Sequence, residues 1–238
     1  MKIHRELLSS KMTRVMIDSE DEKIVRHFNN PRNYADVIIE QINTERMYDE
    51  MFEGEEDLVV LDIGGNVGLF TMYVQDCAKA VYTVEPTPDH FYILGQLTGQ
   101  FPNVHPVNVA LFNEDTEIDF YISEENSTMN SAVNQYGKKT PVQARRVGSI
   151  MKELGLDHVD FVKCDIEGSE MAALNDDTIG EVKDKIDNWF LEIHATSTGS
   201  IETNREIIKG VFERAGYEVQ YFKHDGLFAF NPAQYDQE

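Results

Sequence analysis

The chain of 238 residues lacks any apolar run that approaches the roughly 20 residues a helix needs to cross a bilayer. We therefore expect no membrane-spanning segment. Its first ten residues also lack the continuous apolar core of a signal peptide. Only two cysteines occur, Cys77 and Cys164, and they stand far apart in apolar surroundings, which favours free thiols over a disulfide. Together these absences favour a cytoplasmic protein.

Basic residues are also scarce, because 21 lysines and arginines stand against 43 aspartates and glutamates, for a formal net charge of −22. A surface this negative repels the phosphate backbone of nucleic acids, so a nucleic-acid partner is disfavoured. The hydrophobic fraction of 41% is that of a globular protein. The length suits one well-buried α/β domain with an N-terminal appendage.

What the chain does contain is a strand signal followed directly by a glycine-rich turn. The β-branched and aliphatic run 58–63 predicts a buried strand, and an apolar helical segment follows the turn. Four small or turn-forming residues stand between them: Gly64, Gly65, Asn66 and Gly68. Glycine lets the backbone turn sharply and approach a ligand closely, and the start of the next helix presents free N–H groups. The pattern indicates either the entry to a nucleotide-type pocket or an ordinary strand-to-helix turn.

Strand and helix signals alternate from residue 58 onward, which predicts a parallel sheet with helices on both faces. The predicted strands are 58–63, 80–84, 104–110, 159–164, 189–193, 217–222 and 227–231. Residues 111–148 interrupt the alternation with two extended segments and a polar loop. We interpret them as an inserted strand pair that either contacts the substrate or is a plain surface excursion.

The N-terminal residues 1–57 are expected to form a helical cover on the domain 58–238. A helix is predicted near 20–28, and apolar residues at helical spacing predict an amphipathic helix from Tyr34 to Met51.

The identity of the ligand can be narrowed from two acids. Glu85 follows the second predicted strand, 21 positions after Gly64, where an acid is placed to hydrogen-bond ribose hydroxyls. A phosphate-binding loop would need Gly-Lys followed by Ser or Thr, which is absent. Asp62, two residues before the turn, would repel a pyrophosphate but suits a cationic ligand. S-adenosylmethionine has a ribose and a sulfonium but no phosphate, so it is consistent with both acids.

A second group of ionisable residues ends two other predicted strands. Lys163 and Asp165 are two positions apart and therefore share a face, and a buried lysine needs such a partner. Glu192 and His194 repeat this spacing. If the two strands are neighbours, these side chains converge at the carboxyl end of the sheet, where open α/β folds bind ligands. They are then either acid–base candidates or a structural ion-pair network.

Taken together, these segments resemble the FkbM-type family of S-adenosylmethionine-dependent methyltransferases. The matching segments are 60–68, 84–86, 108–111, 160–170 and 191–194. The resemblance implies a Rossmann-like class I methyltransferase fold, with a seven-stranded, mostly parallel sheet and an antiparallel last strand. It also implies O-methylation of a hydroxyl on a small molecule, sugar or natural product. The cofactor-binding residues that it implies are Asp62, Gly64, Gly65, Asn66 and Gly68 at the methionine end, Glu85 at the ribose, Ala110 near the adenine, and Asp165.

Methyl transfer to oxygen requires a base for the hydroxyl proton. The candidates are Lys163, Asp165, Glu167, Glu192 and His194. We place His194 and Lys163 first, because the former has a suitable pKa and burial can lower that of the latter. Four of the candidates also offer ligands for a divalent ion, although a metal-free reaction is favoured. The alternatives are a cofactor-binding module without catalysis and an RNA methyltransferase.

Overall fold

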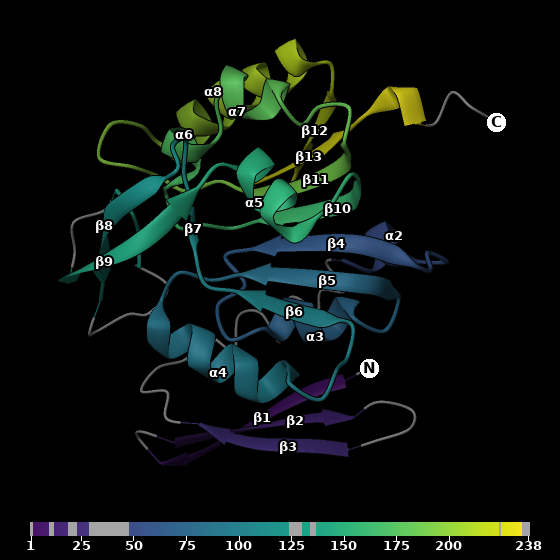
Figure 1. Cartoon of the computed structure of the whole chain (residues 1–238), viewed down its shortest axis with the longest axis vertical. Helices are drawn as coiled ribbons and strands as arrows, with labels where there is room; N and C mark the ends of the chain where they lie inside the picture. Colours follow the sequence, from purple (N-terminus) through teal and green to yellow (C-terminus); the bar gives the residue numbers. More distant parts are fainter. Residues whose placement is uncertain are drawn as a thin grey trace.

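The structure is a computed structural model that describes residues 2–9, 12–18, 23–28, 48–123, 130–133, 137–223 and 225–234. Its central element is a seven-stranded sheet with the order β12-β13-β11-β10-β4-β5-β6 (Figure 1). Five strands are parallel: β4 (Leu58–Ile63), β5 (Ala78–Val84), β6 (Val104–Val107), β10 (Val159–Cys164) and β11 (Ile186–Glu192). The last strand, β13 (Gly226–Phe230), runs antiparallel to both β11 and β12 (Glu218–Phe222). The predicted fold class is confirmed.

Helices cover both faces of this sheet (Figure 1). One face packs against α2 (Asp49–Phe52), α3 (Leu69–Val74) and α4 (Pro88–Thr98). The other face packs against α5 (Val147–Leu154), α6 (Glu170–Ala173), α7 (Asp176–Gly180) and α8 (Ile201–Ala215). A short 3-10 helix, η2 (Pro232–Gln234), follows β13.

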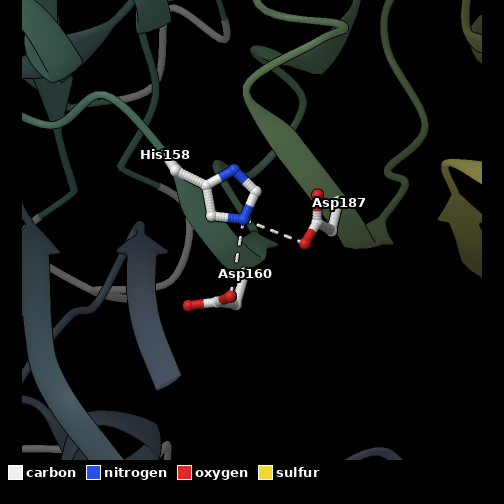
Figure 2. A group of neighbouring side chains, drawn as sticks. All are labelled: His158, Asp160 and Asp187. Atoms are coloured by element: carbon white, nitrogen blue, oxygen red, sulfur yellow. Dashed lines mark hydrogen bonds and ion pairs between the residues drawn. The ribbon is translucent and has the colours of Figure 1, made fainter. Parts of the chain in front are cut away.

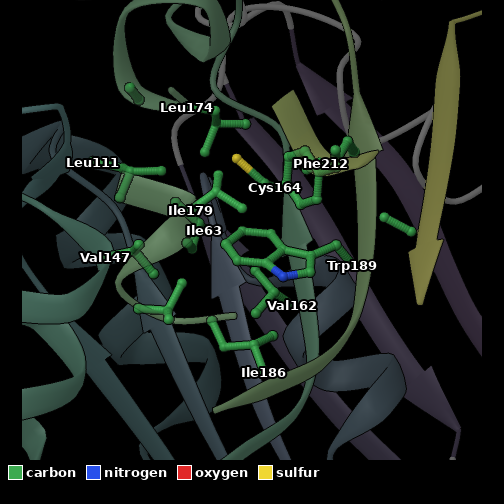
Figure 3. Packing of buried hydrophobic residues seen from close by; sticks show 14 of the residues in the cluster. Ile63, Leu111, Val147, Val162, Cys164, Leu174, Ile179, Ile186, Trp189 and Phe212 are labelled. Atoms are coloured by element: carbon green, nitrogen blue, oxygen red, sulfur yellow. The ribbon is translucent and has the colours of Figure 1, made fainter. Parts of the chain in front are cut away.

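The central strands are buried on both faces, which explains their continuous apolar sequences. Neighbouring residues of β11 enter different cores: Trp189 packs on the α8 side and Phe190 on the α3 side. Figure 3 shows Trp189 at the centre of the first core. The ring centroids of Trp189 and Phe212 are 5.3 Å apart, and the two ring planes are nearly perpendicular. Cys164 is buried in this core and Cys77 is half-buried, and both are free thiols as predicted. This alternation decides which side of the sheet each polar residue of the site faces.

The predicted insertion is a small second sheet. It contains β7 (Ala110–Leu111), β8 (Thr116–Ile122) and β9 (Lys138–Arg145) in the order β7-β9-β8. β8 and β9 pair antiparallel, as expected for an inserted strand pair. Most of the polar loop between them, residues 124–129, lies outside the described residues.

The N-terminal part differs from the predicted helical cover. Residues 2–28 contribute three strands, β1 (Lys2–Ser9), β2 (Met12–Asp18) and β3 (Lys23–Phe28), paired antiparallel in sequence order. The helix predicted near 20–28 is therefore wrong, because adjacent β-branched residues at 24 and 25 suit a strand and β2 supplies its hydrogen-bond partner. Of the helix predicted from Tyr34 to Met51, residues 34–47 lie outside the described residues, and α2 begins at Asp49.

Candidate active site

A cavity of about 320 Å³ lies at the carboxyl ends of the parallel strands. Its walls come from the segments that follow β4, β5, β10 and β11, together with parts of β7, β8 and residues 130–132. This is where the sheet topology predicts a ligand site. Among the predicted site residues, those that line it are Gly64, Asn66, Glu85, Ala110, Asp165, Glu167, Glu192 and His194.

The glycine turn forms one wall and is held tightly against neighbouring strands. The N–H groups of Gly64 and Gly65 both donate to the carbonyl oxygen of Val84, at 2.9 and 3.1 Å. Gly64 has a φ of +81°, and a Cβ added there would lie 1.7 Å from the carbonyl oxygen of Asp165. The turn therefore needs glycine at 64 for backbone conformation and for close packing.

Two further glycines of the turn face protein atoms and are not among the cavity-lining residues. A Cβ at Gly65 would lie 2.1 Å from the side chain of Thr83, and one at Gly68 would lie 2.5 Å from that of Leu94. Both were predicted to bind the cofactor directly. In this structure they shape the turn that presents Gly64 and Asn66 to the cavity.

Glu85 stands where the sequence predicted it, at the end of β5 and on the cavity wall. One carboxylate oxygen accepts a hydrogen bond from the backbone N–H of Asn66 at 2.9 Å. The other accepts from the N–H of Thr87 at 2.7 Å. Each oxygen retains a lone pair for a ligand hydroxyl. Glu85 thus connects the glycine turn to the segment after β5.

Asp62 lies beneath the turn and is not among the cavity-lining residues. Its side chain is fully buried, and one oxygen accepts from the hydroxyl of Thr71 at 2.6 Å. The other oxygen has no hydrogen-bond partner among the described residues. Burial raises the pKa of this carboxyl, while the charge of Lys163 opposes the shift. Asp62 is therefore separated from a ligand in the cavity by the residues that line it.

Lys163 also lies behind the cavity wall. Its ammonium group is 3.0 Å from Asp165 Oδ2 and 5.8 Å from the centre of the Phe70 ring. Burial alone would lower the pKa of Lys163, but the nearby carboxylates, above all Asp165, raise it. Lys163 is therefore a charged partner that holds Asp165.

The segment after β10 turns around the buried carboxylate of Glu170. One oxygen of this fully buried side chain accepts from the N–H groups of Ile166 and Gly168, each at 3.2 Å. The same oxygen is 3.0 Å from His194 Nδ1. Since an ionised carboxylate only accepts, Nδ1 carries the proton of this hydrogen bond. Glu170 was not among the predicted site residues, because sequence spacing does not reveal its contact with a strand 24 residues away.

The remaining nitrogen of His194, Nε2, faces two carboxylates. It lies 3.5 Å from Glu167 Oε2 and 3.8 Å from Asp165 Oδ1. Burial lowers the pKa of His194, but the hydrogen bond and charge of Glu170, with the other carboxylates, raise it to about 10. Burial and the Asp165 charge raise the pKa of Glu167 to about 8. The Asp165 charge and burial raise that of Glu192 to about 7.

Two groups of side chains in the described part of the chain have the composition and spacing to hold a metal ion. Asp165, Glu167 and His194 form the first, and their ligand atoms lie within 4.8 Å of one another. The second group lies at the amino-terminal ends of β10 and β11, away from the cavity, and consists of His158, Asp160 and Asp187 (Figure 2). There His158 Nε2 is 3.0 Å from Asp187 Oδ2 and 3.5 Å from Asp160 Oδ1. Sequence reasoning missed this second group, although His158 and Asp160 show the same two-residue spacing.

The inserted sheet closes the cavity on another side with residues that were not predicted individually. Asn130 is buried, accepts from the N–H of Ser123 at 2.8 Å and donates to the hydroxyl of Thr87 at 3.2 Å. Ser169 accepts from the N–H of Ala132 at 3.1 Å. These bonds attach the insertion to the segments that follow β5 and β10. The polar sequence of residues 124–131 was the available sign that this insertion contributes side chains to the site.

Comparison with known proteins identifies the family. A family model described as the methyltransferase FkbM domain matches residues 62–219. The chain belongs to the FkbM methyltransferase family. The match includes the glycine turn and Glu85, and the predicted family is confirmed.

Among curated relatives, this FkbM methyltransferase is 24% identical to the AMB antimetabolite synthetase AmbE of Pseudomonas aeruginosa, over 77% of this chain and 11% of AmbE. It is 27% identical to the hexuronic acid methyltransferase AglP of Haloferax volcanii, over 60% of this chain and 59% of AglP. The chain thus spans about a tenth of the length of AmbE and about three fifths of the length of AglP. The fibrillarin pre-rRNA processing protein of Methanococcus jannaschii shares the fold, with a TM-score of 0.51 and 13% identity. The superposition covers 97% of this chain and 99% of the fibrillarin chain.

The cavity of the FkbM methyltransferase fits S-adenosylmethionine by size and by donor set. Its volume falls within the usual range for small-molecule sites. Glu85 presents carboxylate oxygens that can accept from hydroxyl groups, and Ala110, Leu111 and Phe120 form an apolar part of the wall. The cavity carboxylates suit a positively charged sulfonium. In the described part of the chain, no helix has the length and apolar character needed to span a membrane.

Proposed function

We propose that this FkbM methyltransferase transfers a methyl group from S-adenosylmethionine to a hydroxyl oxygen of a small molecule, such as a sugar or a natural product. The observation that carries the proposal is that Glu85 and the Asp165–His194 group line the same cavity. Glu85 is placed to recognise the ribose of a nucleoside, and the Asp165–His194 group offers acid–base residues. The 27% identity to a hexuronic acid methyltransferase supports a sugar-like acceptor.

The chain's own residues would divide the binding work as follows. Gly64 and Asn66 bring backbone atoms to the methionine end, Glu85 accepts from the ribose hydroxyls, and Ala110 packs near the adenine. Asp62, Gly65 and Gly68 act by holding the turn in place. The catalytic domain is assigned to residues 58–238, with Tyr48 and Phe52 of the preceding segment packed into its core.

Catalysis then depends on alignment and on removal of one proton. The cofactor supplies the methyl group, so the sulfur–carbon bond breaks as the oxygen–carbon bond forms, and the bonding electron pair remains on sulfur. Holding donor and acceptor in line supplies much of the rate. The hydroxyl proton must pass to a group that contacts the acceptor within the cavity.

Glu192 is the base that the geometry favours. Lys163 does not line the cavity, because its ammonium group is bonded to Asp165 behind the wall. His194 has Nδ1 committed to Glu170 and Nε2 facing two carboxylates. Glu192 lines the cavity and stands outside the Asp165–Glu167–His194 group. We therefore place Glu192 ahead of His194 and Lys163, which the sequence had favoured.

The test is an acceptor screen with methyl-labelled cofactor on the full chain. Sugars, uronic acids, hydroxylated natural products and RNA are incubated separately, and the labelled position is determined by NMR. Label on a hydroxyl oxygen of a small molecule supports the proposal. Label on nitrogen, carbon or RNA overturns it, and cofactor binding without any transfer supports the catalytically silent module instead. RNA is the disfavoured acceptor because of the net charge of −22.

A further inference from the structure

The cavity has an excess of carboxylates that the described residues do not balance. Among the described residues that line it, four carry carboxylates: Glu85, Asp165, Glu167 and Glu192. Among the described residues, the cationic partners of these carboxylates are Lys163, which is bonded to Asp165 from behind the wall, and the His194 ring, which lies 3.5 Å from Glu167 and 3.8 Å from Asp165, so the carboxylates still outnumber the cations. Like charges gathered in a partly buried site are costly unless a cation joins them. The cofactor brings one cation near the glycine turn, which leaves the Asp165 side of the cavity to be explained.

The geometry on that side is that of a metal-ligand set. Asp165 and Glu167 follow β10, and His194 follows β11, so the ends of two adjacent strands present all three side chains to one place. The distances from His194 Nε2 to the two carboxylates are 3.5 and 3.8 Å. Ligand atoms bonded to one ion at about 2.1 Å stand about 3.0 to 4.2 Å apart. The three side chains therefore need only small shifts to share an ion.

Two independent features direct these atoms toward the site. Glu170, whose side chain is fully buried, accepts the hydrogen bond of His194 Nδ1 and so leaves Nε2 as the nitrogen that faces the cavity. This is the usual arrangement of a metal-ligating histidine held by an outer carboxylate. In addition, Asp165 Oδ1 is a buried oxygen that accepts no hydrogen bond from any described group, and it lies on the His194 side of the carboxylate.

We propose that Asp165, Glu167 and His194 bind a divalent metal ion in the cavity wall, with Glu170 as the positioning residue that orients His194. Two carboxylates and one imidazole suit Mn²⁺ or a similar first-row ion. The open positions of the ion face the cavity, where they suit an acceptor with two neighbouring oxygens, such as a vicinal diol or a hydroxy acid. This role for the ion rests on the proposed function, whereas metal binding itself does not.

The experiment measures Mn²⁺ binding to the full chain after treatment with chelator, by electron paramagnetic resonance of free Mn²⁺ and by calorimetry, without cofactor or acceptor. We expect one site per chain. Glu167→Gln and His194→Gln should weaken binding at least tenfold, and Glu170→Gln about 10- to 100-fold. Asp165 is left intact because its loss would leave Lys163 buried without a partner. Far-ultraviolet circular dichroism and thermal unfolding establish that each variant is folded.

The second His–Asp group could itself hold an ion, so variants of it serve as the matched control that tells which of the two groups binds Mn²⁺. His158→Gln and Asp187→Asn change a histidine and a carboxylate of similar spacing that lie outside the cavity. These variants should bind Mn²⁺ as the parent chain does. The proposal is overturned if Mn²⁺ does not bind below about 1 mM, if the cavity variants bind it unchanged, or if binding is lost in the control variants. If Mn²⁺ does not bind and methyl transfer persists in chelator, the metal site is rejected and the proposed methyltransferase activity is retained. If Mn²⁺ binds but no methyl transfer occurs, the metal site is retained and the proposed activity is rejected.

Discussion

The carboxylate of Glu85 joins two backbone segments, because one oxygen accepts from the N–H of Asn66 at 2.9 Å and the other from that of Thr87 at 2.7 Å. The residue that the sequence predicts to bind ribose therefore also holds the glycine turn in register with β5. A ligand hydroxyl at this position would meet an acid that is already fixed in place. This relationship makes the cofactor site sensitive to the charge and shape of a single side chain.

Replacing Glu85 by Gln should weaken S-adenosylmethionine binding. Only one oxygen remains, so one of the two N–H groups would face an amide nitrogen. Hydrogen bonds to a charged partner contribute about 1.5–3 kcal/mol, which corresponds to a loss of affinity of roughly 10- to 100-fold. Calorimetric titration with the cofactor measures this, with Glu114→Gln, an exposed acid, as the control. An affinity equal to that of the parent would remove Glu85 from the cofactor site.

Gly64→Ala should destabilise the fold far more than Gly54→Ala. Both glycines have positive φ, +81° and +83°, so the backbone penalty of about 1–2 kcal/mol is common to both. Only at position 64 would the new Cβ meet an atom, the carbonyl oxygen of Asp165 at 1.7 Å, whereas nothing lies within 4 Å at position 54. We expect a further loss of at least about 2 kcal/mol in the free energy of unfolding for Gly64→Ala. Denaturant unfolding of both variants tests this, and equal losses would contradict it.

The buried hydroxyl of Tyr217 should make stability fall at high pH. It donates to the carbonyl oxygen of Ile186 at 2.8 Å, and burial, opposed by the Trp189 hydrogen bond, raises the pKa of Tyr217 to about 12. Because this folded-state pKa is above the unfolded value near 10, the stabilisation is complete below pH 10. It is lost as the pH rises toward 12, by up to about 3 kcal/mol.

Tyr217→Phe isolates this effect from other groups that titrate in the same range. At pH 8 the variant should be less stable by about 1 kcal/mol, because the hydrogen bond to Ile186 is gone. Between pH 10 and 12 its free energy of unfolding should decline less than that of the parent, so the difference narrows. Urea unfolding at pH 8, 10 and 11.5 provides the comparison. A constant difference across these values would show that Tyr217 ionises equally in both states.

Glu192→Gln should lower turnover while preserving cofactor binding. If Glu192 accepts the hydroxyl proton, its loss should reduce kcat by about 10²- to 10⁴-fold, while the cofactor affinity changes by no more than about threefold. Transfer from labelled cofactor to the acceptor found in the screen measures kcat, and Glu218→Gln, exposed on β12, is the control. Retained turnover would return the role of base to another cavity residue.

Part of this protein follows from local sequence alone. The run that ends in Gly64, the acid at Glu85 and the two-residue spacing of Lys163 and Asp165 predict strand ends with particular side chains. Parallel strands place those ends at one edge of the sheet, so the position of the cavity follows as well. The resemblance then names the family, which the match over residues 62–219 confirms.

The tertiary structure alone decided which side of the sheet and which neighbour each side chain meets. Asp62 alternates onto the α3 face and bonds Thr71 beneath the turn, and no spacing rule distinguishes that position from the cavity. The bond of Glu170 to His194 joins the first residue of α6 to the segment after β11, which only the packing of β10 beside β11 brings together. The N-terminal strands show the same limit, because strand pairing depends on partners that a local helix signal does not take into account. Local sequence determines backbone shape and period, whereas contacts between distant segments depend on how the layers pack.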